Sequence, residues 1–164
     1  MRPSRVMVAL LVCLALGCSD QPEPAPRAAN PGRLFEALVE AWDSHDFAAV
    51  DTLMDPLAIH ENLALGFRGE GLDQIKAFMR ETFTLIPDFD WRPVNIVVDG
   101  PQAAAEWTLA GTYTGDTPQG PVKNRRFLVR GASVMVTEHG RITRFTDYYN
   151  LAEFYRQVTQ KPTK

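Results

Sequence analysis

The segment GRITRFTDYYNL, residues 140–151, decides the fold class of this chain. Its period-two alternation predicts a strand over 141–149, with Phe145, Asp147 and Tyr149 on one face. The residues that follow have helical spacing and predict a short helix over 151–158. An acid flanked by two aromatic side chains is unusual for a solvated strand face. We therefore expect this face to line a partly dry pocket.

The chain before this strand predicts three helices and then a series of strands. Apolar residues at helical spacing predict a helix that stops near Ser44, a second one capped by Asp46, and a third over 71–85. The strand-like segments are 57–62, 91–98, 102–113 and 126–137, with a turn expected at 66–69. This order predicts an α+β fold, in which a cone-shaped, curved antiparallel sheet wraps around three N-terminal helices and ends in a short C-terminal helix. The open end of such a cone suits a small molecule.

The N-terminal end has the pattern of an export signal. Two arginines precede a short apolar run that is too short to span a bilayer, so we interpret residues 1–18 as a signal peptide. The sequence LALGC, which ends at Cys18, resembles a bacterial lipobox, and this resemblance implies lipidation of Cys18. Ordinary cleavage beside an incidental cysteine is the alternative.

The Pro-rich stretch 19–30 has no large apolar side chain and is expected to tether the anchor to a domain at 31–164. By resemblance to lipoprotein sorting, Ser19 after the cysteine favours the periplasmic face of the outer membrane in a Gram-negative host. The expected location is therefore the cell envelope, with the membrane as a partner through Cys18.

The composition excludes several classes of protein. A hydrophobic fraction of 45% and a charged fraction of 23% exclude a disordered chain and a polytopic membrane protein. The net charge is −3 and Lys and Arg form no run longer than two, so no nucleic-acid partner is expected. No cofactor motif is present, and His45, His60 and His139 lack ligand spacing. We expect neither a cofactor nor a metal.

Several strings, in this order, resemble the nuclear-transport-factor-2-like superfamily over residues 33–158, and within it the SnoaL-like polyketide cyclases and limonene epoxide hydrolase. The strings are IHEN (59–62), PDF (87–89), EWTLAGTYTG (106–115) and GRITRFTDYYNL (140–151). The resemblance implies a catalytic carboxylate at Asp147. It also implies that Asn62 and the residue at His60, where the hydrolases have Tyr, position a water molecule. A structural role, in which Asp147 bonds to backbone or Tyr hydroxyl groups, is the alternative.

Glu106 is the residue on which alternation and resemblance disagree. Ala105, Trp107 and Leu109 form an apolar face that would turn Glu106 outward. The resemblance instead places Glu106 beside Asp147, as a second catalytic carboxylate, and leaves Trp107 for a dimer interface. We follow the resemblance here. Because the hydrolases carry Arg and Asp where this chain has Glu106 and Thr108, epoxide hydrolysis by their route is disfavoured.

The sequence leaves two functions open. In the first, Asp147, His60 and Glu106 serve a cofactor-free cyclase or isomerase that moves a proton next to a carbonyl group. An ungapped comparison with ketosteroid isomerase places the base of that enzyme near Glu61 instead. In the second, the chain is a non-catalytic ligand-binding or interaction module of the cell envelope. In both, a small hydrophobic molecule is expected to contact Asn62, Trp91, Phe145, Tyr149 and Phe154, and a homodimer is possible.

Overall fold

The computed structural model describes residues 30–160. Four helices and six strands follow one another in this part of the chain: α1 (Pro31–Asp43), α2 (Phe47–Leu53), β1 (Met54–Asn62), β2 (Phe67–Glu70), α3 (Leu72–Leu85), β3 (Asp90–Asp99), β4 (Gln102–Gly115), β5 (Val122–Glu138), β6 (Arg141–Tyr149) and α4 (Leu151–Thr159). The α+β architecture, with a curved, unclosed sheet and a short C-terminal helix, confirms the expected fold class.

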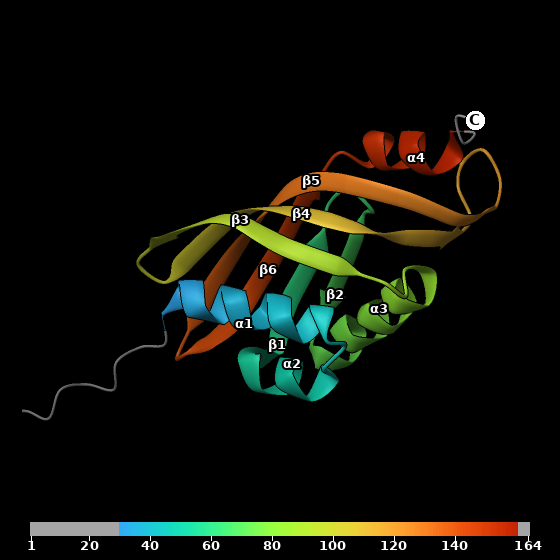
Figure 1. Ribbon diagram of the computed structural model, residues 1–164. Coiled ribbons are helices and arrows are strands. Elements are labelled where there is room, and N and C mark those ends of the chain that lie inside the picture. Colours follow the sequence, from blue (N-terminus) through green and yellow to red (C-terminus); the bar gives the residue numbers. More distant parts are fainter. Residues whose placement is uncertain (1–29, 161–164) are drawn as a thin grey trace, which may run out of the picture.

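The six strands form one sheet in the order β2-β1-β6-β5-β4-β3. Figure 1 shows α1, α2 and α3 together on one side of this sheet and α4 at its other end, beside β5. β6 lies between β1 and β5, so residues 144–147 of β6 have a paired residue on both sides. Asp147 lies opposite Asn62 of β1 and opposite Ser133 of β5. This position in the middle of the sheet determines which side chains can reach Asp147.

Two details of the sheet differ from the expectation. Only residue 66 of the turn expected at 66–69 lies in a turn, which spans residues 63–66, while residues 67–69 belong to the strand β2, which pairs antiparallel with β1. The sheet is also not antiparallel throughout, because β1 and β6 pair in parallel. A parallel pair needs a long crossover connection, and the segment from β2 to β5 supplies it. The local sequences of β1 and β6 do not show that these two distant strands pair in parallel.

Side-chain caps start three of the helices. Asn30 accepts hydrogen bonds from the first backbone N–H groups of α1, Asp46 does so for α2, and Asn150 does so for α4. Such caps satisfy donors that the helix itself leaves free. The helices then bury their apolar faces against the concave side of the sheet, where Phe35, Ile75 and Met79 are fully buried.

Several predictions concern residues outside the part that is described. The signal peptide over 1–18, the lipidation of Cys18 and the tether, apart from Asn30, lie there, as do the last four residues of the domain expected at 31–164. Between residues 30 and 160, no helix combines the length and the apolar character that a membrane span requires.

Gly131 of β5 makes room for the ring of Trp107, its neighbour on β4. A Cβ atom at position 131 would lie 2.2 Å from that ring and 2.6 Å from the carbonyl oxygen of Tyr148. We expect Gly131→Ala to lower the free energy of unfolding by about 1–3 kcal/mol, because the ring or the strand must move. Urea unfolding followed by circular dichroism measures this change.

Arg130→Ala is the matched control, because Arg130 is the exposed neighbour on the same strand. It should change the free energy of unfolding by less than about 0.5 kcal/mol. Equal stability of the Gly131 variant and the wild type would show that Trp107 is not confined by this glycine.

Candidate active site

A cavity of about 380 Å³ lies between the concave face of the sheet and the helices. More than half of the side chains that line it are aromatic, and they come from α1, α3, α4 and all six strands or the segments joining them. Two lining residues carry a charge, Asp147 deep on β6 and Glu81 on α3, and both are acidic. Because Glu81 is exposed, Asp147 is the charged group that the enclosed part of the cavity presents.

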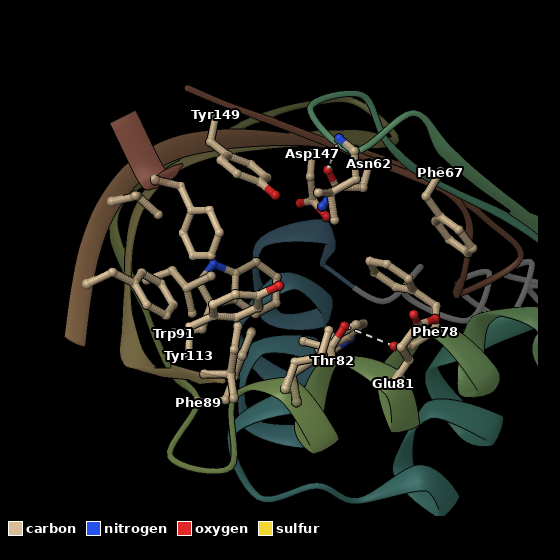
Figure 2. A pocket seen from close by; sticks show the side chains of 18 of the residues that line it. Asn62, Phe67, Phe78, Glu81, Thr82, Phe89, Trp91, Tyr113, Asp147 and Tyr149 are labelled. Carbon is tan, nitrogen blue, oxygen red and sulfur yellow. Dashed lines mark hydrogen bonds between the residues drawn. The ribbon is translucent and has the colours of Figure 1, made fainter. Parts of the chain in front are cut away.

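The five residues expected to contact a ligand all line this cavity: Asn62, Trp91, Phe145, Tyr149 and Phe154. Alternation along β6 therefore predicted the inward face correctly, since Phe145, Asp147 and Tyr149 share it. Figure 2 shows the Asp147 carboxyl group and the Tyr149 hydroxyl group reaching into the cavity from one wall, with the stacked rings of Phe67 and Phe78 at one side. That these residues bind a molecule stays a prediction.

Asp147 receives one side chain from each neighbouring strand. Ser133 of β5 donates its hydroxyl hydrogen to Oδ1 at 2.5 Å, and Nε2 of His60 on β1 lies 2.9 Å from Oδ2. A carboxylate in an apolar cavity needs such partners, because an unpaired buried charge is costly. The side chain is 13% exposed, so Asp147 is held in place but remains open to the cavity.

His60 lies behind Asp147 and does not itself line the cavity. Its side chain is 3% exposed, and its ring centroid lies 5.4–5.8 Å from four aromatic rings, those of Trp42, Phe67, Phe78 and Phe145. These rings restrict the orientation of the imidazole. The structure thus brings His60 into contact with Asp147, a contact that the sequence did not predict, and places it where it reaches a ligand only through Asp147.

Tyr149 provides a hydroxyl group on the same wall. Burial raises the pKa of this hydroxyl above its ordinary value, the nearby Asp147 carboxylate raises it further, and the side chain of Asn62 opposes the shift. The hydroxyl therefore keeps its hydrogen at neutral pH and can donate it in a hydrogen bond. A base and a neutral donor thus lie next to each other in one apolar cavity.

The placement expected for Glu106 is wrong. Glu106 is exposed on the outer face of β4, while Ala105 and Trp107 are buried on the inner face. The alternation of side chains along this strand predicts the outward position of Glu106 correctly, because side chains on a regular strand must alternate between its two faces. The resemblance predicts the wrong position. Glu106 therefore cannot share a proton with Asp147, and Trp107, which lines the cavity, is not available for a dimer interface.

Glu61, the other candidate base, also faces outward. Its carboxylate pairs with Arg68 at 2.7 Å and with Arg144 on the neighbouring strand. The hydrogen bond from Arg68 holds the pKa of Glu61 below its ordinary value, although partial burial opposes this shift. A carboxylate that is paired with two arginines is a poor proton acceptor. Asp147 is thus the acid of the described residues that reaches the enclosed cavity.

Ser133 and Trp107 are the site residues that the sequence reasoning missed. Ser133 is fully buried, and its oxygen accepts a hydrogen bond from Nε1 of Trp107 at 2.7 Å. A signal was present, because alternation along 126–137 places Ser133 in an inward row with Phe127, Val129 and Met135. A lone hydroxyl group in such a row needs a partner. Only the pairing of β5 with β6 shows that this partner is Asp147.

Between residues 30 and 160, no three His, Cys, Asp or Glu side chains lie close enough together to hold a metal ion. Asp147 has one histidine beside it and aromatic groups around it. The carboxylate, the imidazole and the Tyr149 hydroxyl group are side chains that can transfer protons and form hydrogen bonds.

Comparison with known proteins identifies similar folds and one family. A putative polyketide cyclase from Pseudomonas putida is 28% identical, with a TM-score of 0.67, over 79% of this chain and 98% of that one. TsrD from Streptomyces laurentii is 25% identical, with a TM-score of 0.68, over 78% and 93% of the two chains. IdmH from Streptomyces antibioticus, a putative polyketide cyclase, is 20% identical, with a TM-score of 0.69, over 79% and 99%.

No curated protein matches the chain significantly. The sequence profile of the SnoaL-like polyketide cyclases, by contrast, matches residues 32–158, which cover most of the chain. This match includes every strand of the sheet and every residue of the cavity described above. The chain belongs to the SnoaL-like polyketide cyclase family.

Proposed function

We propose that this protein binds a flat, hydrophobic carbonyl compound and moves a proton on it with Asp147, as a cofactor-free cyclase or isomerase. The observation that carries this proposal is the Asp147 carboxylate, held by Ser133 and His60 at the wall of an otherwise aromatic cavity. A base of this kind accelerates proton transfer when it lies within reach of the substrate and is partly desolvated.

The proposed step uses the base and the neutral donor together. Asp147 takes the proton from the carbon next to the carbonyl group, and the electron pair of the broken C–H bond moves to the carbonyl oxygen. The Tyr149 hydroxyl donates a hydrogen bond to the enolate oxygen that forms. In a cyclisation, the enolate attacks a second carbonyl carbon of the same molecule, and the alkoxide that forms takes the proton from Asp147. In an isomerisation, the enolate is conjugated with a carbon–carbon double bond and takes the proton back from Asp147 at the far carbon of that bond.

Asp147→Asn should abolish proton abstraction and leave ligand binding intact, because the amide keeps the size of the side chain but is not a base. The probe is β-tetralone in D₂O, whose exchange of α-protons for deuterium is followed by proton NMR. We expect protein-dependent exchange to fall by at least about 100-fold. Tyr149→Phe, which removes the donor, should slow exchange on the order of 100-fold.

Glu106→Gln is the matched control for both variants, since it neutralises an exposed carboxylate on the outer face of the sheet. It should exchange at the wild-type rate. If wild-type protein and Asp147→Asn exchange equally slowly while both bind aromatic ligands, the enzyme proposal fails and the non-catalytic binding module remains.

The charge of the lining predicts which ligands enter. Asp147 and Glu81 are acidic, and no Lys, Arg or His is among the lining residues from the described part of the chain. We expect naphthoate to bind at least about tenfold more weakly than its uncharged methyl ester, because its carboxylate would approach Asp147 in a cavity of low dielectric constant. Quenching of tryptophan fluorescence measures both affinities, since Trp42, Trp91 and Trp107 line the cavity.

The substitution Asp147→Asn tests the cause of this difference. It should bring the two affinities closer together by strengthening the binding of naphthoate. Equal affinities in the wild type would mean that the charge of Asp147 does not select the ligand.

We further propose that the protein is exported and anchored through Cys18, with the domain in the cell envelope. The support is the sequence of the leader, the cysteine and the Pro-rich stretch 19–30. Cys18→Ser should move the protein from the membrane fraction of its host to a fraction released by osmotic shock, as immunoblotting detects. A wild-type protein found in the released fraction would contradict the anchor.

A homodimer formed by the outer face of the sheet is a further part of the proposal. The exposed side chains of Val97, Val134 and Tyr148 give this face an apolar character, and interfaces of this type bury such groups. Light scattering of the purified protein measures its mass, and a monomer at micromolar concentration would contradict the dimer.

A further inference from the structure

The hydrogen bonds behind Asp147 form a chain whose direction is fixed. An indole N–H is only a donor, so Ser133 must accept at its oxygen the hydrogen bond from Nε1 of Trp107, 2.7 Å away. The single hydroxyl hydrogen of Ser133 then points to Oδ1 of Asp147, 2.5 Å away. Ser133 and Trp107 are both buried, at 0% and 3% exposure. Water therefore does not compete for these bonds.

This direction distinguishes the two oxygens of Asp147. Oδ1 faces the hydroxyl hydrogen of Ser133, because the indole N–H can only donate to the Ser133 oxygen and Oδ1 is the acceptor that lies within reach of this hydroxyl group. Oδ2 faces the imidazole of His60, whose Nε2 can either donate or accept. A proton bound to Oδ1 would point toward the hydroxyl hydrogen of Ser133. A proton bound to Oδ2 can instead be donated in a hydrogen bond to Nε2 of His60.

We infer that Ser133 and Trp107 are positioning residues that make Oδ2 the proton-accepting atom of Asp147. This inference rests on the proposed function. In the step described above, the proton leaves the substrate carbon and binds Oδ2, the electron pair passes to the carbonyl oxygen, and Oδ1 keeps its bond from Ser133 throughout. Trp107 keeps its proton, so the chain orients the carboxylate and does not conduct protons.

Trp107 also connects ligand binding to the base. Its ring lines the cavity, and the centroid of this ring lies 6.2 Å from that of the Trp91 ring and 6.1 Å from that of the Tyr149 ring. Its other side is confined by Gly131, where no Cβ atom would fit. A ligand that packs against this indole therefore contacts the side chain that donates a hydrogen bond to Ser133. The same side chain forms the wall of the cavity and sets the orientation of the catalytic carboxylate.

The first test measures proton exchange of β-tetralone by Ser133→Ala. We expect the maximal rate to fall by about 10-fold, because a hydrogen bond to a charged group is lost, while the affinity for methyl naphthoate stays at the wild-type value. Thr137→Val is the matched control, since Thr137 is a buried residue of the same strand whose hydroxyl donates to the carbonyl oxygen of Pro101, away from Asp147. It should lower stability and leave the maximal rate unchanged.

The second test does not depend on catalysis. In ¹⁵N-labelled protein, Asp147→Asn should shift the indole N–H resonance of Trp107, because Ser133 lies between the Asp147 side chain and the indole and transmits the change. The same substitution should shift this resonance in the Thr137→Val background and leave it unchanged in the Ser133→Ala background.

The two tests separate the two proposals. If wild-type protein does not exchange β-tetralone, the proposed function fails with this probe, and the effect of Asp147→Asn on the indole resonance still decides whether Ser133 holds Asp147. If Ser133→Ala keeps the wild-type rate and Asp147→Asn still shifts the indole resonance in its background, the inference is overturned. Should Ser133→Ala not fold, Trp107→Phe replaces it, because it keeps an aromatic wall and removes the donor. Its maximal rate should fall as well, and an unchanged rate would refute the role of the indole.

Discussion

The need to hydrogen-bond a carboxylate inside an aromatic cavity governs the organisation of this protein. A charge in apolar surroundings is tolerated only with partners, and Asp147 obtains one on each side because β6 lies between β1 and β5. Ser133 lies directly opposite Asp147 on β5, whereas His60 lies opposite Phe145 on β1, two residues away along the strand, and reaches Asp147 with its longer side chain. If β6 were an edge strand, Asp147 would lack one of them.

The two faces of the sheet surround their carboxylates with different partners in this region. On the inner face, Asp147 contacts Ser133 and His60 and remains open to the cavity. On the outer face, Glu61, one residue after His60, is neutralised by Arg68 and Arg144. Alternation thus separates a carboxylate suited to chemistry from one suited to structure, although both lie in the same part of the sheet. The arginines are excluded from the cavity for the same geometric reason.

The wall of the cavity consists mainly of large aromatic rings. These rings also contact the groups behind Asp147: those of Trp42, Phe78 and Phe145 enclose His60, and the indole of Trp107 donates a hydrogen bond to Ser133. The lining of the cavity and the surroundings of Asp147 are therefore built from the same side chains, so that a change of wall residue alters both.

The sequence by itself determined the order of the elements apart from β2, the α+β fold class and the inward face of β6, because alternation and helical spacing are local properties of a segment. Alternation alone would have turned Glu106 outward, as observed, but the expectation followed the resemblance and placed Glu106 wrongly in the site. Only the tertiary structure decided that β1 pairs with β6 in parallel and that β5 brings Ser133 and Trp107 to Asp147. Strand order and register depend on contacts between distant segments, and no local pattern around residue 133 or 147 specifies which strand lies beside it.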